Sequence, residues 1–224
     1  MPAAVLFDFG GTLDADGVTW KERVIRLYRD EGVAVTDASF DPLFYAADDA
    51  LVGTVPRTLG FPETVAHLTS GVTRGLGLDD PALAARVATR FVDAARATLR
   101  RNAAVLHALG RRYRLGIVSN FYGNLARVCA DCGVDDLFDV IIDSAEVGVS
   151  KPNPAIFQRA LDRLRLSPAD VIFVGDSARR DMAGARAAGL AHVWLVAERA
   201  DTAVPCCPGD RVIGSLKDLE EILP

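Results

Sequence analysis

The feature that most constrains this sequence is a short apolar run that ends in a carboxylate and a pair of glycines. Residues 3–7 are all apolar, which is typical of a parallel strand buried on both faces. Asp8 follows the run directly, and Gly10 and Gly11 let the chain turn sharply after it. Because open α/β sheets bind ligands outside the carboxyl ends of their strands, Asp8 is a candidate functional residue.

The second half of the chain alternates between short apolar strands and helices. Strands are expected at 115–119, 138–143, 171–175, 192–196 and 211–213, and helices at 123–131, 154–164, 180–188 and after Ser215. This alternation predicts an α/β fold with a doubly wound, Rossmann-like parallel sheet and helices on both faces. The first strand must join this sheet, so residues 1–14 and 103–224 are expected to form one core.

Residues 15–102 show helical periodicity without a convincing strand. Four apolar stripes at helical spacing occur here, and Gly32, Gly53, Pro62 and Asp80 mark where helices end or begin. We therefore expect an all-helical insert, of the size of a small bundle, that interrupts the α/β core.

Composition and charge indicate an ordinary globular protein and do not suggest a polyanion as its main partner. The chain has 224 residues, of which 50% are apolar, and its formal net charge is −5, which does not favour a nucleic-acid partner. No apolar run approaches the roughly 20 residues that span a bilayer, and no stretch has a signal-peptide pattern. We expect a cytoplasmic protein without a membrane partner, and the sequence indicates no oligomeric state.

Polar side chains follow four of the predicted strands and should meet at one edge of the sheet. They are Asp8, Ser119, Asn120, Lys151, Asp176 and Asp181. Carboxylates are ligands that Mg²⁺ favours, and hydroxyl and backbone N–H groups can bind phosphate oxygens. Lys151 would offset the negative charge of substrate and carboxylates. This set of groups suits a phosphoryl group together with a divalent cation.

Four motifs in this order resemble those of the haloacid dehalogenase (HAD) superfamily, in the branch with a helical cap inserted after the first strand. The four matching stretches are Asp8-Phe9-Gly10-Gly11-Thr12-Leu13, Ile117-Val118-Ser119-Asn120, Gly148-Val149-Ser150-Lys151-Pro152-Asn153-Pro154, and Gly175-Asp176-Ser177 through Asp181 to Gly184-Ala185. The resemblance covers nearly the whole chain, although the cap matches only in size and helicity.

The resemblance implies a phosphatase that acts on a small phosphorylated metabolite through an aspartyl-phosphate on Asp8, which water then cleaves. Its catalytic residues would be Asp8, Ser119 and Lys151. Its phosphate-binding residues would be Thr12, Ser119, Asn120 and Lys151. Mg²⁺ would be bound by Asp8, the backbone carbonyl of Gly10, Asp176 and Asp181. The cap would close over the site and select the substrate, with Trp20, Tyr45, Arg57, His67 and Arg74 as candidate contacts.

One position departs from this pattern. Phosphatases of the family carry an acid two residues after the nucleophile, where this chain has Gly10. That acid protonates the leaving oxygen and later activates water, and such a group typically contributes about 10²–10⁴-fold in rate. The chain is therefore expected to hydrolyse its substrate slowly.

Three explanations for Gly10 remain open. Asp14, Asp16 or His67 could replace the missing acid. Alternatively, the chain could cleave C–P bonds as phosphonoacetaldehyde hydrolases do, which needs a Schiff-base lysine in the cap, where Lys21 is the only lysine. Finally, hydrolysis could be lost, which would leave a phosphate-binding or regulatory protein that binds a phospho-metabolite without turning it over. Dehalogenases of the superfamily need no metal and lack the acid pair at 175–181, which disfavours dehalogenation.

Overall fold

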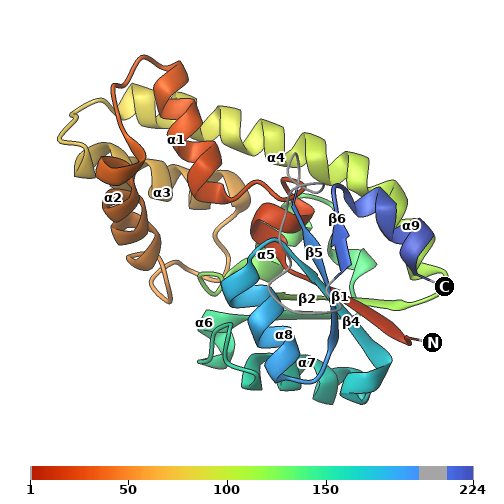
Figure 1. Cartoon of the computed structure of the whole chain (residues 1–224). Helices are drawn as coiled ribbons and strands as arrows, with labels where there is room; N and C mark the ends of the chain where they lie inside the picture. The colour runs from red at the N-terminus through yellow and green to blue at the C-terminus, as the bar shows by residue number, and fades with distance from the viewer. Residues whose placement is uncertain (1, 197–210, 224) are drawn as a thin grey trace.

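A parallel β-sheet forms the centre of the molecule in the computed structural model, which describes residues 2–196 and 211–223 (Figure 1). Its strands are β1 (Ala4–Phe7), β2 (Arg114–Ser119), β3 (Val140–Asp143), β4 (Val171–Gly175), β5 (Ala191–Leu195) and β6 (Arg211–Ile213). Their order across the sheet is β3-β2-β1-β4-β5-β6, and each neighbouring pair is parallel. The prediction of a doubly wound, Rossmann-like α/β fold is confirmed.

Helices cover both faces of this sheet and also form a block beside it. They are α1 (Trp20–Asp30), α2 (Asp37–Asp49), α3 (Phe61–Gly75), α4 (Pro81–Gly110), α5 (Leu125–Asp131), α6 (Ser144–Val147), α7 (Ala155–Leu164), α8 (Ala183–Ala187) and α9 (Leu219–Ile222). Short helical segments are η1 (Phe9–Leu13), η2 (Asp135–Leu137), η3 (Pro168–Asp170), η4 (Ala178–Met182) and η6 (Leu216–Asp218). No helix in the described ranges is both long and apolar enough to cross a membrane.

The buried side chains form two clusters, one on each face of the sheet. Along β1, Val5 and Phe7 belong to the cluster with α4, α5 and α9, whereas Ala4 and Leu6 belong to the cluster with α7 and α8. This division follows from the geometry of a strand, in which successive side chains point to opposite faces. Because both faces are covered, β1 is apolar throughout, and its first polar residue, Asp8, comes where the strand ends.

The helices α1, α2, α3 and the N-terminal part of α4 form what we call the helical block, which stands at the carboxyl ends of the strands (Figure 1). The sequence places a domain boundary at residue 102, and this point lies inside α4, a single helix of 30 residues that runs on over the core. The Asn102 side chain donates a hydrogen bond of 3.0 Å to the Leu13 carbonyl, so the two crossings between block and core meet there.

An aromatic cluster joins the block to the core. The Trp20 ring lies 5.0–6.3 Å, centre to centre, from four other aromatic rings, those of Phe61, Phe91, Phe121 and Tyr122. Trp20 itself is only 9% exposed. Aromatic pairs at such distances add to the stability that burial already provides, so the block is held firmly against the carboxyl edge of the sheet.

Candidate active site

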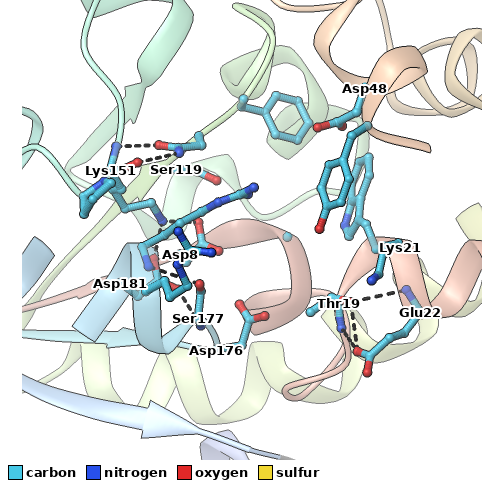
Figure 2. A pocket seen from close by; sticks show the side chains of 18 of the residues that line it. Asp8, Thr19, Lys21, Glu22, Asp48, Ser119, Lys151, Asp176, Ser177 and Asp181 are labelled. Atoms are coloured by element: carbon cyan, nitrogen blue, oxygen red, sulfur yellow. Dashed lines mark hydrogen bonds and ion pairs between the residues drawn. The ribbon is translucent and has the colours of Figure 1, made fainter. Parts of the chain in front are cut away.

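Asp8 lies at the middle of the sheet's carboxyl edge, since β1 has β2 on one side and β4 on the other. Phe7 pairs with Ile117 and with Val174, and the Asp8 N–H donates to the Val174 carbonyl at 2.9 Å. The next polar residues along the two neighbouring strands are Ser119 and Asp176, which therefore flank Asp8. The strand ends predicted from the sequence thus meet in one place (Figure 2).

Lys151 joins two of the acidic residues through its ammonium group. Its Nζ lies 2.6 Å from Asp8 Oδ1 and 2.7 Å from Asp181 Oδ1, and Lys151 is only 4% exposed. Burial opposes the charged form of Lys151, but the carboxylates of Asp181 and Asp8 outweigh it and raise the lysine pKa. Lys151 therefore places a positive charge within reach of the nucleophile candidate.

Three carboxylates share this small space. Asp8, Asp176 and Asp181 each offer an oxygen, and these oxygens all lie within 4.8 Å of one another. Burial raises the pKa of Asp181 to about 6, and burial together with the charges of Asp181 and Asp8 raises the pKa of Asp176 well above its ordinary range. The single ammonium of Lys151 does not neutralise three carboxylates, so the group keeps excess negative charge. The carboxylate oxygens are hard donors, which fit Mg²⁺.

The turn after β1 is shaped by the position of Asp176. Gly11 has φ of +91°, and a Cβ there would stand 2.6 Å from Asp176 Oδ2. A side chain is therefore excluded at this position by both backbone conformation and space. The hydroxyl of the fully buried Thr12 donates to Asp176 Oδ1 at 3.0 Å. Thr12 thus orients the Asp176 carboxylate from behind rather than facing the cavity.

Ser119 and Asn120 follow β2 and differ in what their side chains do. The Asn120 side chain accepts from the Lys151 N–H at 2.8 Å and donates to the Lys151 carbonyl at 3.0 Å. The Asn120 side chain therefore fixes the loop that carries Lys151. Because both its polar atoms are used there, only the backbone of Asn120 is available to contact a phosphate. Ser119 is 2% exposed and lines the cavity beside Asp8.

A cavity of about 630 Å³ extends from Asp8 to the helical block. Its block side is formed by Thr19, Trp20, Lys21, Glu22, Phe44, Tyr45 and Asp48, and its core side also includes Phe121, Tyr122, Ser177, Arg179 and Arg180. Of the cap residues expected to contact substrate, Trp20 and Tyr45 line this cavity, whereas Arg57, His67 and Arg74 are not among its lining residues.

Several lining residues have no signal in the sequence. Asp48 and Arg180 look like ordinary charged residues on helices, and only the docking of the block onto the core turns them toward a shared cavity. The Thr19 capping box, in which Glu22 Oε2 accepts from the Thr19 N–H at 3.0 Å, could have been read from the sequence. It fixes where α1 begins and hence which first-turn residues face Asp8.

The Asp14 side chain connects the turn after β1 to helix α1 through hydrogen bonds. Its carboxylate accepts from the Gly11 N–H at 2.7 Å, from Trp20 Nε1 at 2.8 Å and from Arg23 at 2.7 Å, and Asp14 is 1% exposed. The second candidate acid, Asp16, is bonded to Arg101 and Asn102. Neither aspartate lines the cavity.

His67, the third candidate acid, is exposed on α3 away from the cavity. Lys21 does line the cavity, but its Nζ pairs with Asp41 at 2.7 Å, and this hydrogen bond raises the Lys21 pKa. A lysine that forms a Schiff base must lose its proton, so this pairing disfavours the phosphonate-cleaving alternative.

Fold and site together define an α/β protein with a Rossmann-like parallel sheet, a carboxylate centre at the carboxyl edge of that sheet and a helical block over it. A family model described as haloacid dehalogenase-like hydrolase matches residues 2–189, and the chain belongs to that family. The resemblance seen in the four motifs is thereby confirmed.

A relative with a named activity is the pyrimidine 5'-nucleotidase YjjG of Escherichia coli, which is 36% identical over 121 residues. That alignment covers 53% of each protein, so the chain spans about half the length of the curated relatives it matches.

Among solved structures, the HAD-hydrolase YfnB from Bacillus subtilis, bound to magnesium, superposes with a TM-score of 0.61 at 22% identity, covering 99% of this chain and 98% of the other. A dehalogenase superposes with a TM-score of 0.67 at 23% identity, covering 99% of this chain and 97% of the other. At these identities the superpositions establish the fold alone.

Proposed function

We propose that this chain is a Mg²⁺-dependent phosphohydrolase of a small phosphorylated metabolite, with Asp8 as the nucleophile. The observation that carries the proposal is the position of Asp8, which combines a central strand end, an ion pair with Lys151 and two further carboxylates within 4.8 Å. The similarity to a nucleotidase supports phosphomonoesters as substrates. The dehalogenase-like superpositions share the fold but do not explain three clustered carboxylates.

The chain's own residues have distinct roles in this proposal. Asp8 attacks the phosphorus atom, and Lys151 and Ser119 hold the phosphoryl oxygens. Thr12 and Asn120 act indirectly, since they orient Asp176 and the Lys151 loop. The helical block serves as the cap, which excludes water and contacts the rest of the substrate.

Mg²⁺ would be held by Asp8, Asp176, Asp181 and the backbone carbonyl of Gly10. It would supply positive charge against the phosphoryl oxygens. The donor set fits, because three carboxylates lie together beside one ammonium. Burial, and after it the charge of neighbouring carboxylates, raises the pKa values of Asp176 and Asp181, and a cation would offset that negative charge.

The test is phosphate release from a panel of phosphomonoesters with and without Mg²⁺, using wild type, Asp8→Asn and a matched control. Asp162→Asn makes the same chemical change at an exposed position on α7 that does not line the cavity. We expect Mg²⁺-dependent release by wild type and Asp162→Asn and none by Asp8→Asn. Release that persists in Asp8→Asn would refute the assignment of the nucleophile.

A second candidate function is phosphate binding without turnover, and the absence of a side chain at Gly10 favours it. In that case no ester would be hydrolysed, but a phospho-metabolite would still raise the melting temperature of the protein. Wild-type and Asp8→Asn proteins would then behave alike in the release assay.

A further inference from the structure

The space next to the nucleophile on the block side is filled by an indole instead of an acid. A Cβ built on Gly10 would stand 3.1 Å from Trp20 Nε1 and 3.3 Å from Trp20 Cδ1. Trp20 is fixed there by its hydrogen bond to Asp14 and by the aromatic cluster. The wall that faces the leaving group beside Asp8 is therefore an indole whose N–H is already used.

The other carboxyl groups near this wall are also engaged. Glu22 accepts from the Thr19 N–H and hydroxyl at 3.0 and 2.8 Å. Asp48 accepts from the Tyr122 hydroxyl and stands across the cavity from Asp8 in Figure 2. Asp14 does not line the cavity and accepts from Gly11, Trp20 and Arg23. Apart from the three clustered aspartates, the carboxyls around the described cavity are thus bonded within the protein.

Positive charge, by contrast, is present and unpaired. Arg180 lines the cavity one residue before Asp181, and within the described ranges its guanidinium takes part in no ion pair or hydrogen bond. The charge of Arg180 also acts on two other residues that line the cavity, Asp48 and Tyr122. Burial raises the pKa values of Asp48 and Tyr122, and the Arg180 charge acts against both shifts. Arg180 therefore lines the same cavity as the nucleophile and lies within electrostatic range of Asp48 on the block.

We propose that the substrate is a phosphoryl anhydride, whose leaving group departs as an anion stabilised by Arg180 instead of being protonated. The leaving group would be a carboxylate or a phosphate, both of which are stable anions at neutral pH. This inference rests on the proposed function and names its substrate class. Arg180 becomes the residue that binds the leaving group.

The two steps balance without a protein acid. In the first, a bond forms between Asp8 Oδ and phosphorus while the bond from phosphorus to the bridging oxygen breaks, and its electron pair stays on the departing carboxylate or phosphate. In the second, water attacks phosphorus, the Asp8–phosphorus bond breaks, and one proton passes to solvent as hydrogen phosphate forms. Each step conserves charge.

The test compares kcat/KM for four donors with Mg²⁺: acetyl phosphate, pyrophosphate, p-nitrophenyl phosphate and glycerol 1-phosphate. Consumption of acetyl phosphate is followed directly, because this compound also decays without enzyme. The variants are Arg180→Gln and, as a matched control, Arg159→Gln at an exposed position of α7. The two anhydrides separate a carboxylate from a phosphate leaving group.

We expect wild type to favour at least one anhydride over glycerol 1-phosphate by about 10²–10⁴-fold, the factor that a positioned acid would otherwise contribute. Arg180→Gln should lower kcat/KM for that anhydride by about 10²-fold and change p-nitrophenyl phosphate much less, whereas Arg159→Gln should match wild type.

Glycerol 1-phosphate turned over within about tenfold of both anhydrides would overturn the inference and leave the proposed function intact. An anhydride kcat/KM in Arg180→Gln equal to that of wild type would overturn the role of Arg180. Absence of phosphate release from all four donors would overturn the proposed function, and the inference with it.

Discussion

Three clustered carboxylates and one ammonium leave the site short of positive charge, and single residues control this balance. Asp176 is affected strongly, because burial and the charges of Asp181 and Asp8 all disfavour its ionised form. A divalent cation would remove this penalty. The metal requirement is therefore open to measurement through protein stability as well as through activity.

Asp176→Asn should raise the melting temperature of the metal-free protein and abolish its increase with Mg²⁺. Removing one like charge relieves repulsion, while the loss of a ligand weakens metal binding. In wild type, Mg²⁺ at 100 times its dissociation constant would add about 2.7 kcal/mol, or roughly 5–10 °C at this chain length. Thermal unfolding with EDTA and with Mg²⁺ measures both effects, and an equal Mg²⁺ response in the variant would contradict the ligand assignment.

Asp14→Asn should destabilise the protein far more than it alters the chemistry. The substitution leaves Arg23, whose side chain is 12% exposed, without its carboxylate partner, and breaking a buried pair costs about 3–5 kcal/mol. Denaturant unfolding measures this loss. A drop in kcat with unchanged stability would instead identify Asp14 as the missing acid.

At the scale of elements, the sequence predicted strands and helices well where the signal is local. The strand at 171–175 and the helix at 154–164 follow from apolar runs and caps, and the structure places β4 and α7 there. The continuity of α4 through residue 102 was missed because both its halves are amphipathic. A continuous amphipathic pattern does not show at which residue α4 passes from the helical block to the core.

Helix α3 shows how one element depends on another. Gly60 gives it no side-chain cap, and the Phe61 N–H instead donates to Asp131 Oδ2 of α5 at 3.0 Å. Asp131→Ala should therefore cost about 1 kcal/mol, or roughly 2–4 °C in melting temperature. Asp136→Ala, at an exposed position of η2, is the control. Equal melting temperatures for the two variants would show that α3 needs no cap from the core.

For the whole molecule, the strand-end residues of the site were predictable, whereas the lining contributed by the block was not. Asp8, Ser119 and Asp176 stand at strand ends, and Lys151 lies in the loop after β3 and α6. Parallel topology brings strand ends to one edge of the sheet. Which face of α2 meets the core depends on packing between distant segments. The sequence therefore indicated the chemistry of the site but left out Asp48 and Arg180, which we expect to bear on the substrate.

The contact between Asp48 and Tyr122 crosses from block to core and should make stability depend on pH. Burial raises the Asp48 pKa, so the folded state binds more protons than the unfolded state between the ordinary and the raised values. Stability contributed by this group is thus present at low pH and falls as pH rises through that interval. The melting temperature of Asp48→Asn relative to wild type should increase over that interval and then level off. A difference that does not vary with pH would contradict this.

Both tryptophans of the chain lie at the site. Trp20 covers Gly10, and Trp194 donates its indole N–H to the Asp176 carbonyl at 2.8 Å. The tryptophan fluorescence of the protein therefore arises from two emitters in different layers, one in α1 of the block and one in β5 of the sheet. Emission recorded on the single variants Trp20→Phe and Trp194→Phe would separate events at the two positions, so the protein carries its own optical probes of what enters the cavity.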